Sequence, residues 1–103
     1  MLFVEDFEKN NYSGSNPPPE RQGVYMITDS RDEVLYVGET ENLARREREH
    51  KNFDMFKKTE YFLWHELPKN TSDKRRREIE TDLIQYYKPP RNKEKLPNSS
   101  KQT

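Results

Sequence analysis

One carboxylate, Glu80, falls among apolar residues in a segment with helical periodicity. At about 100° per residue, it shares one broad face with five apolar residues: Ile79, Leu83, Ile84, Tyr86 and Tyr87. An unpaired charge buried among apolar groups is costly, so this carboxylate must be paired or must coordinate something. The helix geometry alone leaves two interpretations open. They are a salt bridge to Arg76, one turn earlier, and a metal-binding or catalytic role.

A second group of chemically capable residues lies in a polar segment that ends near residue 51. The spacing of Leu43, Arg46, Glu47 and His50 places them on one side of a helix. Arg46 and His50 are one turn apart and could converge on a phosphate. Taken alone, the spacing favours a solvated face on which arginine pairs with glutamate. The scarcity of apolar residues predicts a surface helix that uses its polar face.

Two tyrosines, Tyr25 and Tyr36, lie in short apolar segments rich in β-branched residues. Each tyrosine by itself is typical of core or cross-strand packing. Gly38 ends the second segment, where a glycine permits a positive φ or a close approach of another group. The two histidines, His50 and His65, have no spacing that supports a histidine-based metal centre.

These residues must be positioned by a small number of regular elements. Residues 24–27 and 34–37 predict two strands, and a turn at residues 29–32 makes them an antiparallel hairpin. Both strands are apolar on both faces, so we expect the hairpin to be covered on both sides. A helix capped by Thr40 or Asn42 follows, then a strand at residues 61–67. A second helix begins near residues 71–73 and is stopped at Pro89-Pro90. The predicted fold is α/β (α+β), a three-stranded antiparallel sheet with flanking helices in the order β-β-α-β-α.

Length and composition allow one small domain and exclude several classes of protein. The chain has 103 residues, of which 29% are hydrophobic and 37% charged, with 19 basic and 19 acidic residues. The absence of cysteine excludes a disulfide scaffold and any cysteine-based zinc site. No apolar stretch is long enough for a membrane helix, and the first ten residues do not resemble a secretory signal. We therefore expect a cytoplasmic protein with no membrane partner.

Composition also divides the chain. We predict an N-terminal extension and linker at residues 1–21, a folded domain at residues 22–92, and a basic flexible tail at residues 93–103. The zero net charge hides a gradient, because residues 88–103 contain five basic residues and one acidic residue. Five cations are candidates for contacts to a nucleic-acid backbone, although any single one is typical of a solvated surface: Arg45, Arg48, Arg76, Lys88 and Arg91.

Together these segments resemble the GIY-YIG nuclease domain. The triplets Gly23-Val24-Tyr25 and Tyr36-Val37-Gly38 match the two motifs after which the family is named, with valine in place of isoleucine. Four further motif positions follow in the correct order: Arg46, eight residues after Gly38, then His50, Glu80 in Glu-x-x-Leu-Ile, and Asn92. The resemblance runs from about Gly23 to Asn92, roughly two-thirds of the chain.

The resemblance implies a metal-dependent endonuclease and gives each motif residue a role. It makes Glu80 the ligand of one divalent cation, Mg²⁺ or Mn²⁺, because a hard cation suits a carboxylate whose other partners are water and phosphate. Arg46 would stabilise charge in the transition state. Tyr25 and Tyr36 would orient or deprotonate the attacking water, and His50 is an alternative base or a phosphate contact. Asn92 would hold the site geometry by hydrogen bonding, and Gly23 and Gly38 are the motif's backbone positions.

The resemblance also implies a nucleic-acid partner, with DNA favoured over RNA. Such an enzyme could be structure-specific, or act in repair, recombination or the biology of phages and mobile elements. Because the length leaves no room for a separate reading domain, specificity would come from DNA shape, a protein partner or a homodimer. Two alternatives stay open: a catalytically weak binding module with the same fold, and an RNA-directed nuclease. One residue departs from the pattern, because Glu39 follows the second triplet where members often have lysine or serine. We expect its charge to reduce activity or make it more dependent on metal.

Overall fold

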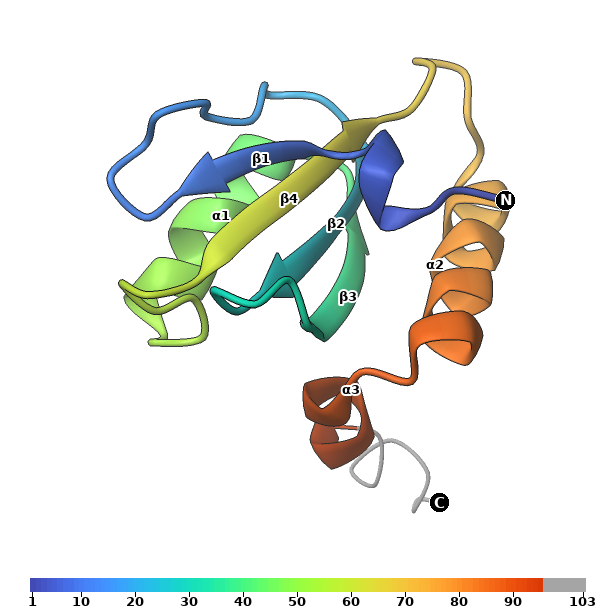
Figure 1. Cartoon of the computed structure of the whole chain (residues 1–103). Helices are drawn as coiled ribbons and strands as arrows, with labels where there is room; N and C mark the ends of the chain where they lie inside the picture. The colour runs from blue at the N-terminus through green and yellow to red at the C-terminus, as the bar shows by residue number, and fades with distance from the viewer. Residues whose placement is uncertain (96–103) are drawn as a thin grey trace.

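One antiparallel sheet with helices on both faces makes up the fold (Figure 1). The structure is a computed structural model, and it describes residues 1–95. The strands β1 (Glu8–Asn11), β2 (Gly23–Thr28), β3 (Val34–Thr40) and β4 (Tyr61–Glu66) have the spatial order β1-β4-β2-β3. The helices are a short 3-10 helix, η1 (Val4–Asp6), and the α-helices α1 (Leu43–Asn52), α2 (Asp73–Tyr87) and α3 (Pro90–Lys95).

The predicted hairpin is confirmed as β2 and β3. In its register Tyr25 lies opposite Gly38, and Ile27 lies opposite Tyr36. The turn is closed by Asp29, whose carboxylate accepts hydrogen bonds from the backbone N–H groups of Glu33 (3.0 Å) and Arg31 (2.8 Å). These backbone hydrogen bonds hold the pKa of Asp29 below its usual range. The turn therefore satisfies its own polar groups and fixes the register of the strands that carry the two tyrosines.

The sheet is covered on both faces, as its apolar strands predict. Alternate residues of a strand point to opposite faces, so β2 contributes to two separate cores. Val24 and Met26 pack with Leu83 of α2 on one face. Tyr25 and Ile27 pack with Leu43 of α1 and other aromatic residues on the opposite face. Figure 1 shows α2 running alongside β3, the strand at one edge of the sheet.

The helix ends follow the expected capping residues. The Asn42 side chain caps α1 by accepting a hydrogen bond from the Arg45 N–H (3.0 Å). The Ser72 hydroxyl caps α2 in the same way, by accepting a hydrogen bond from the Arg75 N–H. At its other end α2 stops at Lys88, which has a left-handed backbone (φ 50°), just before the two prolines.

The prediction of three strands is wrong, because β1 adds a fourth. β1 pairs antiparallel with β4, with Glu8 opposite Trp64 and Asn11 opposite Tyr61. Its sequence, Glu-Lys-Asn-Asn, has low strand propensity. The strand forms because the free edge of β4 offers unpaired backbone groups that β1 satisfies. The segment at residues 1–21 therefore contributes to the sheet, and its first part also contains η1.

The C-terminal end is partly helical. Residues 93–95, the first of the predicted tail, belong to α3. The rest of that predicted tail, residues 96–103, lies outside the described residues. Within residues 1–95 no helix combines the length and the apolar character that crossing a membrane requires.

A buried polar pair ties β1 to α1. Asn10 is fully buried, and its side-chain amide donates a hydrogen bond to the Glu47 carboxylate, which is 8% exposed. The carbonyl oxygen of the same amide accepts from the Asn16 N–H at 2.7 Å. Burial raises the pKa of Glu47, although Lys51 and the Asn10 hydrogen bond act against it. The polar face of α1 is thus partly internal, which differs from the solvated helix that its composition predicts.

Replacing Glu47 with glutamine should raise the thermal stability at pH 7 to 8. A carboxyl group with a raised pKa in the folded state destabilises that state as the pH rises above about 4.3, its ordinary value. Glutamine keeps an oxygen that accepts from Asn10 and does not ionise. In thermal unfolding scans from pH 4 to 8, the advantage of Glu47→Gln should therefore shrink toward pH 4. Glu41→Gln is the control, because Glu41 is exposed. If the melting temperatures of wild type and Glu47→Gln differ by the same amount at every pH, the prediction is contradicted.

Candidate active site

The close approach of Tyr25 to β3 explains the glycine of the second triplet. A Cβ atom at position 38 would lie only 2.4 Å from the Tyr25 hydroxyl oxygen. The phenol ring therefore lies directly over the backbone of Gly38, and any larger residue would displace it. Gly23 is equally constrained, because a Cβ there would lie 2.2 Å from the carbonyl oxygen of His65.

Three of the predicted catalytic side chains meet on the α1 face of the sheet. Tyr25 comes from β2, Tyr36 from β3 and His50 from α1, and all three are buried. The Tyr25 hydroxyl lies 2.8 Å from His50 Nε2. The Tyr36 ring lies 6.1 Å from the Tyr25 ring and 5.4 Å from the His50 ring, between centroids. Tyr25 also stacks on Phe62 of β4, at 5.0 Å, which fixes the plane of its ring.

The environment of Tyr25 keeps its hydroxyl protonated at neutral pH. Burial raises the pKa of Tyr25 far above its ordinary value, and the neighbouring Tyr36 adds to this effect. The Arg46 guanidinium acts in the opposite direction without reversing it. Tyr25 is therefore a hydrogen-bonding partner of His50 in this structure, and not a ready base.

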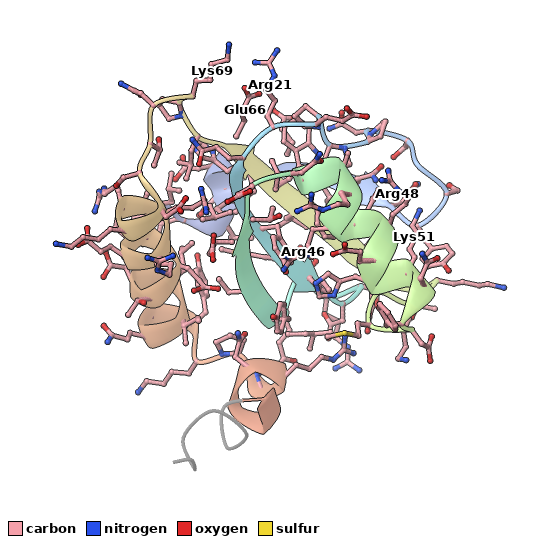
Figure 2. All side chains as sticks on the ribbon, turned by 180° about the vertical axis from the view of Figure 1, so that it is seen from behind. Arg21, Arg46, Arg48, Lys51, Glu66 and Lys69 are labelled. Atoms are coloured by element: carbon pink, nitrogen blue, oxygen red, sulfur yellow. The ribbon has the colours of Figure 1, made fainter. Side chains whose placement is uncertain are left out.

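A cleft of about 170 Å³ opens beside these residues. Its lining combines residues of α1, β3 and the turn after α1: Tyr36, Arg46, Glu49, His50, Phe53 and Met55. Figure 2 shows Arg46 extending from α1 toward β3, whereas Arg48 and Lys51 lie on the other side of the helix. The Arg46 side chain is 33% exposed and can therefore meet a ligand.

The charge of Arg46 is only partly engaged inside the protein. Its Nε lies 3.0 Å from Glu49 Oε1, close enough for an ion pair. This contact is poorly directed, because among the described residues the buried Nε has no hydrogen-bond partner. Arg46 also interacts with the Tyr25 hydroxyl, which acts to lower the pKa of Tyr25.

Asn92 fixes the edge strand that carries Tyr36. Its amide oxygen accepts from the Val37 N–H and its amide nitrogen donates to the Val37 carbonyl, both at 2.8 Å. Asn92 is buried, and it takes the place of a neighbouring strand at this one position of β3. Tyr36 and Gly38, on either side of Val37, are held in register as a result.

Glu80 lies on α2, which packs on the opposite face of the sheet from α1. It is half-buried and is not among the described residues that line the cleft. Its turn of α2 is held against β3 by Arg76, whose Nε lies 2.5 Å from Glu39 Oε1. Arg76 also contacts Asp73 (2.9 Å) and Gln22 (2.5 Å). The structure therefore brings Tyr25, Tyr36, Arg46 and His50 together, and Glu80 is not one of the described residues that line their cleft.

A model of the GIY-YIG catalytic domain matches residues 21–95, which is most of the chain. The chain belongs to the GIY-YIG family. This confirms the resemblance and the fold class, with the corrected number of strands. A GIY-YIG catalytic domain indicates a nuclease, an enzyme that hydrolyses phosphodiester bonds. A comparison with curated proteins found no match to the chain.

The donor set of this GIY-YIG domain suits one hard cation. In residues 1–95 there is no group of three or more histidine, aspartate or glutamate side chains that could enclose a metal ion. Mg²⁺ does not need such a cage, because it commonly keeps several waters and binds one or two carboxylates together with substrate phosphates. Glu80 can supply one such carboxylate, so the residues present fit the cation that the family implies.

Two of the five candidate backbone-binding cations are engaged within the domain. Arg76 is buried in its contacts with Glu39 and Asp73. Arg91 forms a two-pronged ion pair with Glu60, with N–O distances of 2.5 and 3.2 Å. Arg45, Arg48 and Lys88 are exposed, and Arg45 makes a loose ion pair with Glu49 at 3.6 Å. The first two of these lie on α1, the helix that also carries Arg46.

The pairing of Glu39 changes its expected influence on the site. Along β3 it points away from the face of Tyr36, and Arg76 balances its charge.

The sequence alone did not predict Glu49, Phe53 and Met55 as residues of the cleft. For Phe53 and Met55 the available signal was a pair of apolar residues within a polar stretch, a pattern that fits many turns.

Proposed function

We propose that this GIY-YIG domain is a metal-dependent DNA endonuclease. The observation that carries the proposal is the cleft in which the Arg46 guanidinium and the His50 imidazole face the same small space. An anion held by Arg46 would lie beside a group able to accept a proton. These are the two requirements for attack of water on a phosphodiester.

Arg46 would bind the scissile phosphate and stabilise the charge that develops on its oxygens. The planar guanidinium offers several N–H groups in a fixed arrangement that matches phosphate. The exposed part of the guanidinium would donate these hydrogen bonds to the phosphate oxygens. A cation held by Glu80 would supply Lewis-acid polarisation of the phosphate when bound.

His50 is the best candidate for the group that takes a proton from the attacking water, at Nδ1, in the tautomer whose Nε2–H donates to the Tyr25 hydroxyl. It lines the cleft, whereas Tyr25 is fully buried behind it and is kept protonated by its surroundings. We assign Tyr25 as a positioning residue that orients the imidazole through the 2.8 Å hydrogen bond. Tyr36 lines the cleft as well and would help to hold the water in place.

The proposal is tested by incubating the protein with plasmid DNA, branched DNA and structured RNA, each with Mg²⁺ or with EDTA. Cleavage of DNA that requires the metal is the expected result. Binding without cleavage of any substrate would identify a binding module with the same fold. Cleavage confined to RNA would identify an RNA-directed nuclease and would contradict the choice of DNA.

Tyr25→Phe should lower the cleavage rate by about ten-fold, because one orienting hydrogen bond contributes about 1 to 1.5 kcal/mol. The phenyl ring keeps the stacking on Phe62, but the buried His50 Nε2 loses this partner, so the thermal stability should fall by about 1 to 3 kcal/mol. The loss should fall on kcat and leave KM nearly unchanged, because Arg46 still binds the phosphate. A rise in KM with an unchanged kcat would contradict the positioning role. Tyr61→Phe on β4 makes the same chemical change away from the cleft and should leave the rate unchanged.

A further inference from the structure

The cleft has an exposed apolar rim that phosphate chemistry does not explain. Phe53 is 75% exposed and Met55 is 40% exposed, and both line the cleft that contains Arg46 and His50. The other exposed aromatic side chains among residues 1–95 are Phe3 and Tyr86, and these two pack edge to face at 5.4 Å. The Phe53 ring, in contrast, is presented to solvent at the mouth of the site.

The turn that presents Phe53 is firmly built. The Phe53 N–H donates to the Glu49 carbonyl (3.0 Å), and the Met55 N–H donates to the His50 carbonyl (2.7 Å). Asp54 adopts a left-handed backbone with a φ of 59°, and the Lys57 ammonium donates to its carbonyl oxygen at 2.9 Å. Hydrogen bonds therefore fix the turn to the last residues of α1. A backbone held in advance loses little conformational entropy when the side chain that it presents binds a partner.

Neighbouring side chains anchor the C-terminal end of this turn. Phe56 is 1% exposed and packs on Phe62 within the aromatic core. The Arg91 guanidinium, which pairs with Glu60, also lies 3.4 Å from the Met55 carbonyl oxygen. Phe56 thus points into the core, whereas Phe53 and Met55 line the cleft. The exposure of Phe53 and Met55 is a consequence of this fixed backbone.

The combination of a cation and a free ring in one cleft matches the chemistry of a nucleotide. Arg46 offers hydrogen bonds to a phosphate, and Phe53 offers a flat apolar surface beside it. A nucleobase has a π-face that stacks on an aromatic side chain whatever its sequence. Both faces of a paired base inside a duplex are already covered by its neighbours, so only an unpaired base can use this ring.

We propose that Phe53, supported by Met55, stacks on an unpaired base next to the scissile phosphate. The enzyme would therefore prefer DNA with an unpaired or displaced nucleotide, such as a bulge, a flap or a branch, over a continuous duplex. This inference rests on the proposed nuclease function and names its substrate class. Met55 would adapt its flexible thioether to the edge of the base.

The test measures binding without cleavage, so that stacking is observed separately from catalysis. Two DNAs of identical sequence carry 2-aminopurine at one position, either unpaired in a one-nucleotide bulge or paired in the duplex. Stacking quenches the fluorescence of this base. Binding is measured in EDTA with the Glu80→Gln protein, into which Phe53→Ala, Phe53→Trp or Tyr86→Ala is introduced.

Quenching of the bulged probe is expected on binding, and Phe53→Ala should remove it. Phe53→Ala should also weaken binding of the bulged DNA by about ten-fold, within the range measured for base–aromatic stacking, and change duplex binding by less than about two-fold. Phe53→Trp should keep both the quenching and the affinity. Tyr86→Ala removes an exposed aromatic side chain outside the cleft and should have no effect.

Three outcomes would overturn the proposal. The first is an equal loss of affinity for both DNAs in Phe53→Ala, and the second is no loss for either DNA. The third is a wild type that is a dimer and a Phe53→Ala variant that is a monomer with the same DNA affinity, which would make the rim a protein interface. The failure of this inference is distinguishable from that of the proposed function. Wild type that cleaves DNA without any dependence on Phe53 overturns only the stacking. If quenching depends on Phe53 but the wild type cleaves no substrate, only the proposed nuclease activity is overturned.

Discussion

Replacing Arg46 with alanine should lower the rate of DNA cleavage by about 10²–10³-fold, the usual effect of removing one fixed donor from a developing oxyanion. Arg46 is the cationic residue among those that line the cleft beside His50. Its side chain is 33% exposed, so the outer part of the guanidinium can meet the substrate. Single-turnover cleavage at saturating enzyme would measure the loss at the chemical step. Arg46→Lys keeps the charge but loses the planar fork, and should recover only part of the rate.

Arg45→Ala provides the matched control. Arg45 is the neighbouring residue of α1, carries the same charge and pairs with the same Glu49, at 3.6 Å. It is exposed and is not part of the cleft lining. Its removal should weaken DNA binding slightly at low salt, as expected for a backbone contact, and leave the single-turnover rate nearly unchanged. Equal rates for Arg45→Ala and Arg46→Ala would refute the role given to Arg46.

Most of the fold was predictable because local signals and the global structure agree. The caps at Asn42 and Ser72 and the prolines after Lys88 mark helix ends through interactions within a few residues. β1 carries no such local signal. Its four residues are polar, and they form a strand because β4 has an edge to pair with, a property of the assembled sheet. A long-range pairing of this kind cannot be inferred from the periodicity of a single segment.

The site was predictable to the extent that its residues follow fixed spacings. Arg46 and His50 share one side of α1, as their separation in the sequence requires. Their partners come from elsewhere in the chain. The burial of Glu47 depends on Asn10 in β1, and the charge of Glu39 is balanced by Arg76 in α2. Spacing within one helix identifies a face but does not reveal which distant group meets it.

Glu80→Gln should reduce cleavage on the order of 10³-fold at a fixed, low Mg²⁺ concentration, because a metal ion stabilises transition-state charge by several kcal/mol. Glutamine has the same shape but offers a neutral oxygen in place of a carboxylate. α2 should keep its position, since Arg76, one turn earlier, remains fixed to Glu39 and Gln22. The measurement is the cleavage rate as a function of Mg²⁺ concentration.

The metal dependence separates a ligand from a structural carboxylate. If Glu80 holds the cation, the half-saturating Mg²⁺ concentration should rise in Glu80→Gln, and high Mg²⁺ should restore part of the rate. Glu78→Gln is the matched control, because Glu78 lies on the same helix, is exposed and pairs only loosely with Arg75, at 3.4 Å. Its Mg²⁺ dependence should equal that of wild type. A loss of rate in Glu80→Gln with an unchanged half-saturating concentration would show that Glu80 acts through the structure of α2, and the metal would then need another ligand. Because Glu80 comes from α2 and Arg46 from α1, the two results together decide whether both helices act on one phosphate.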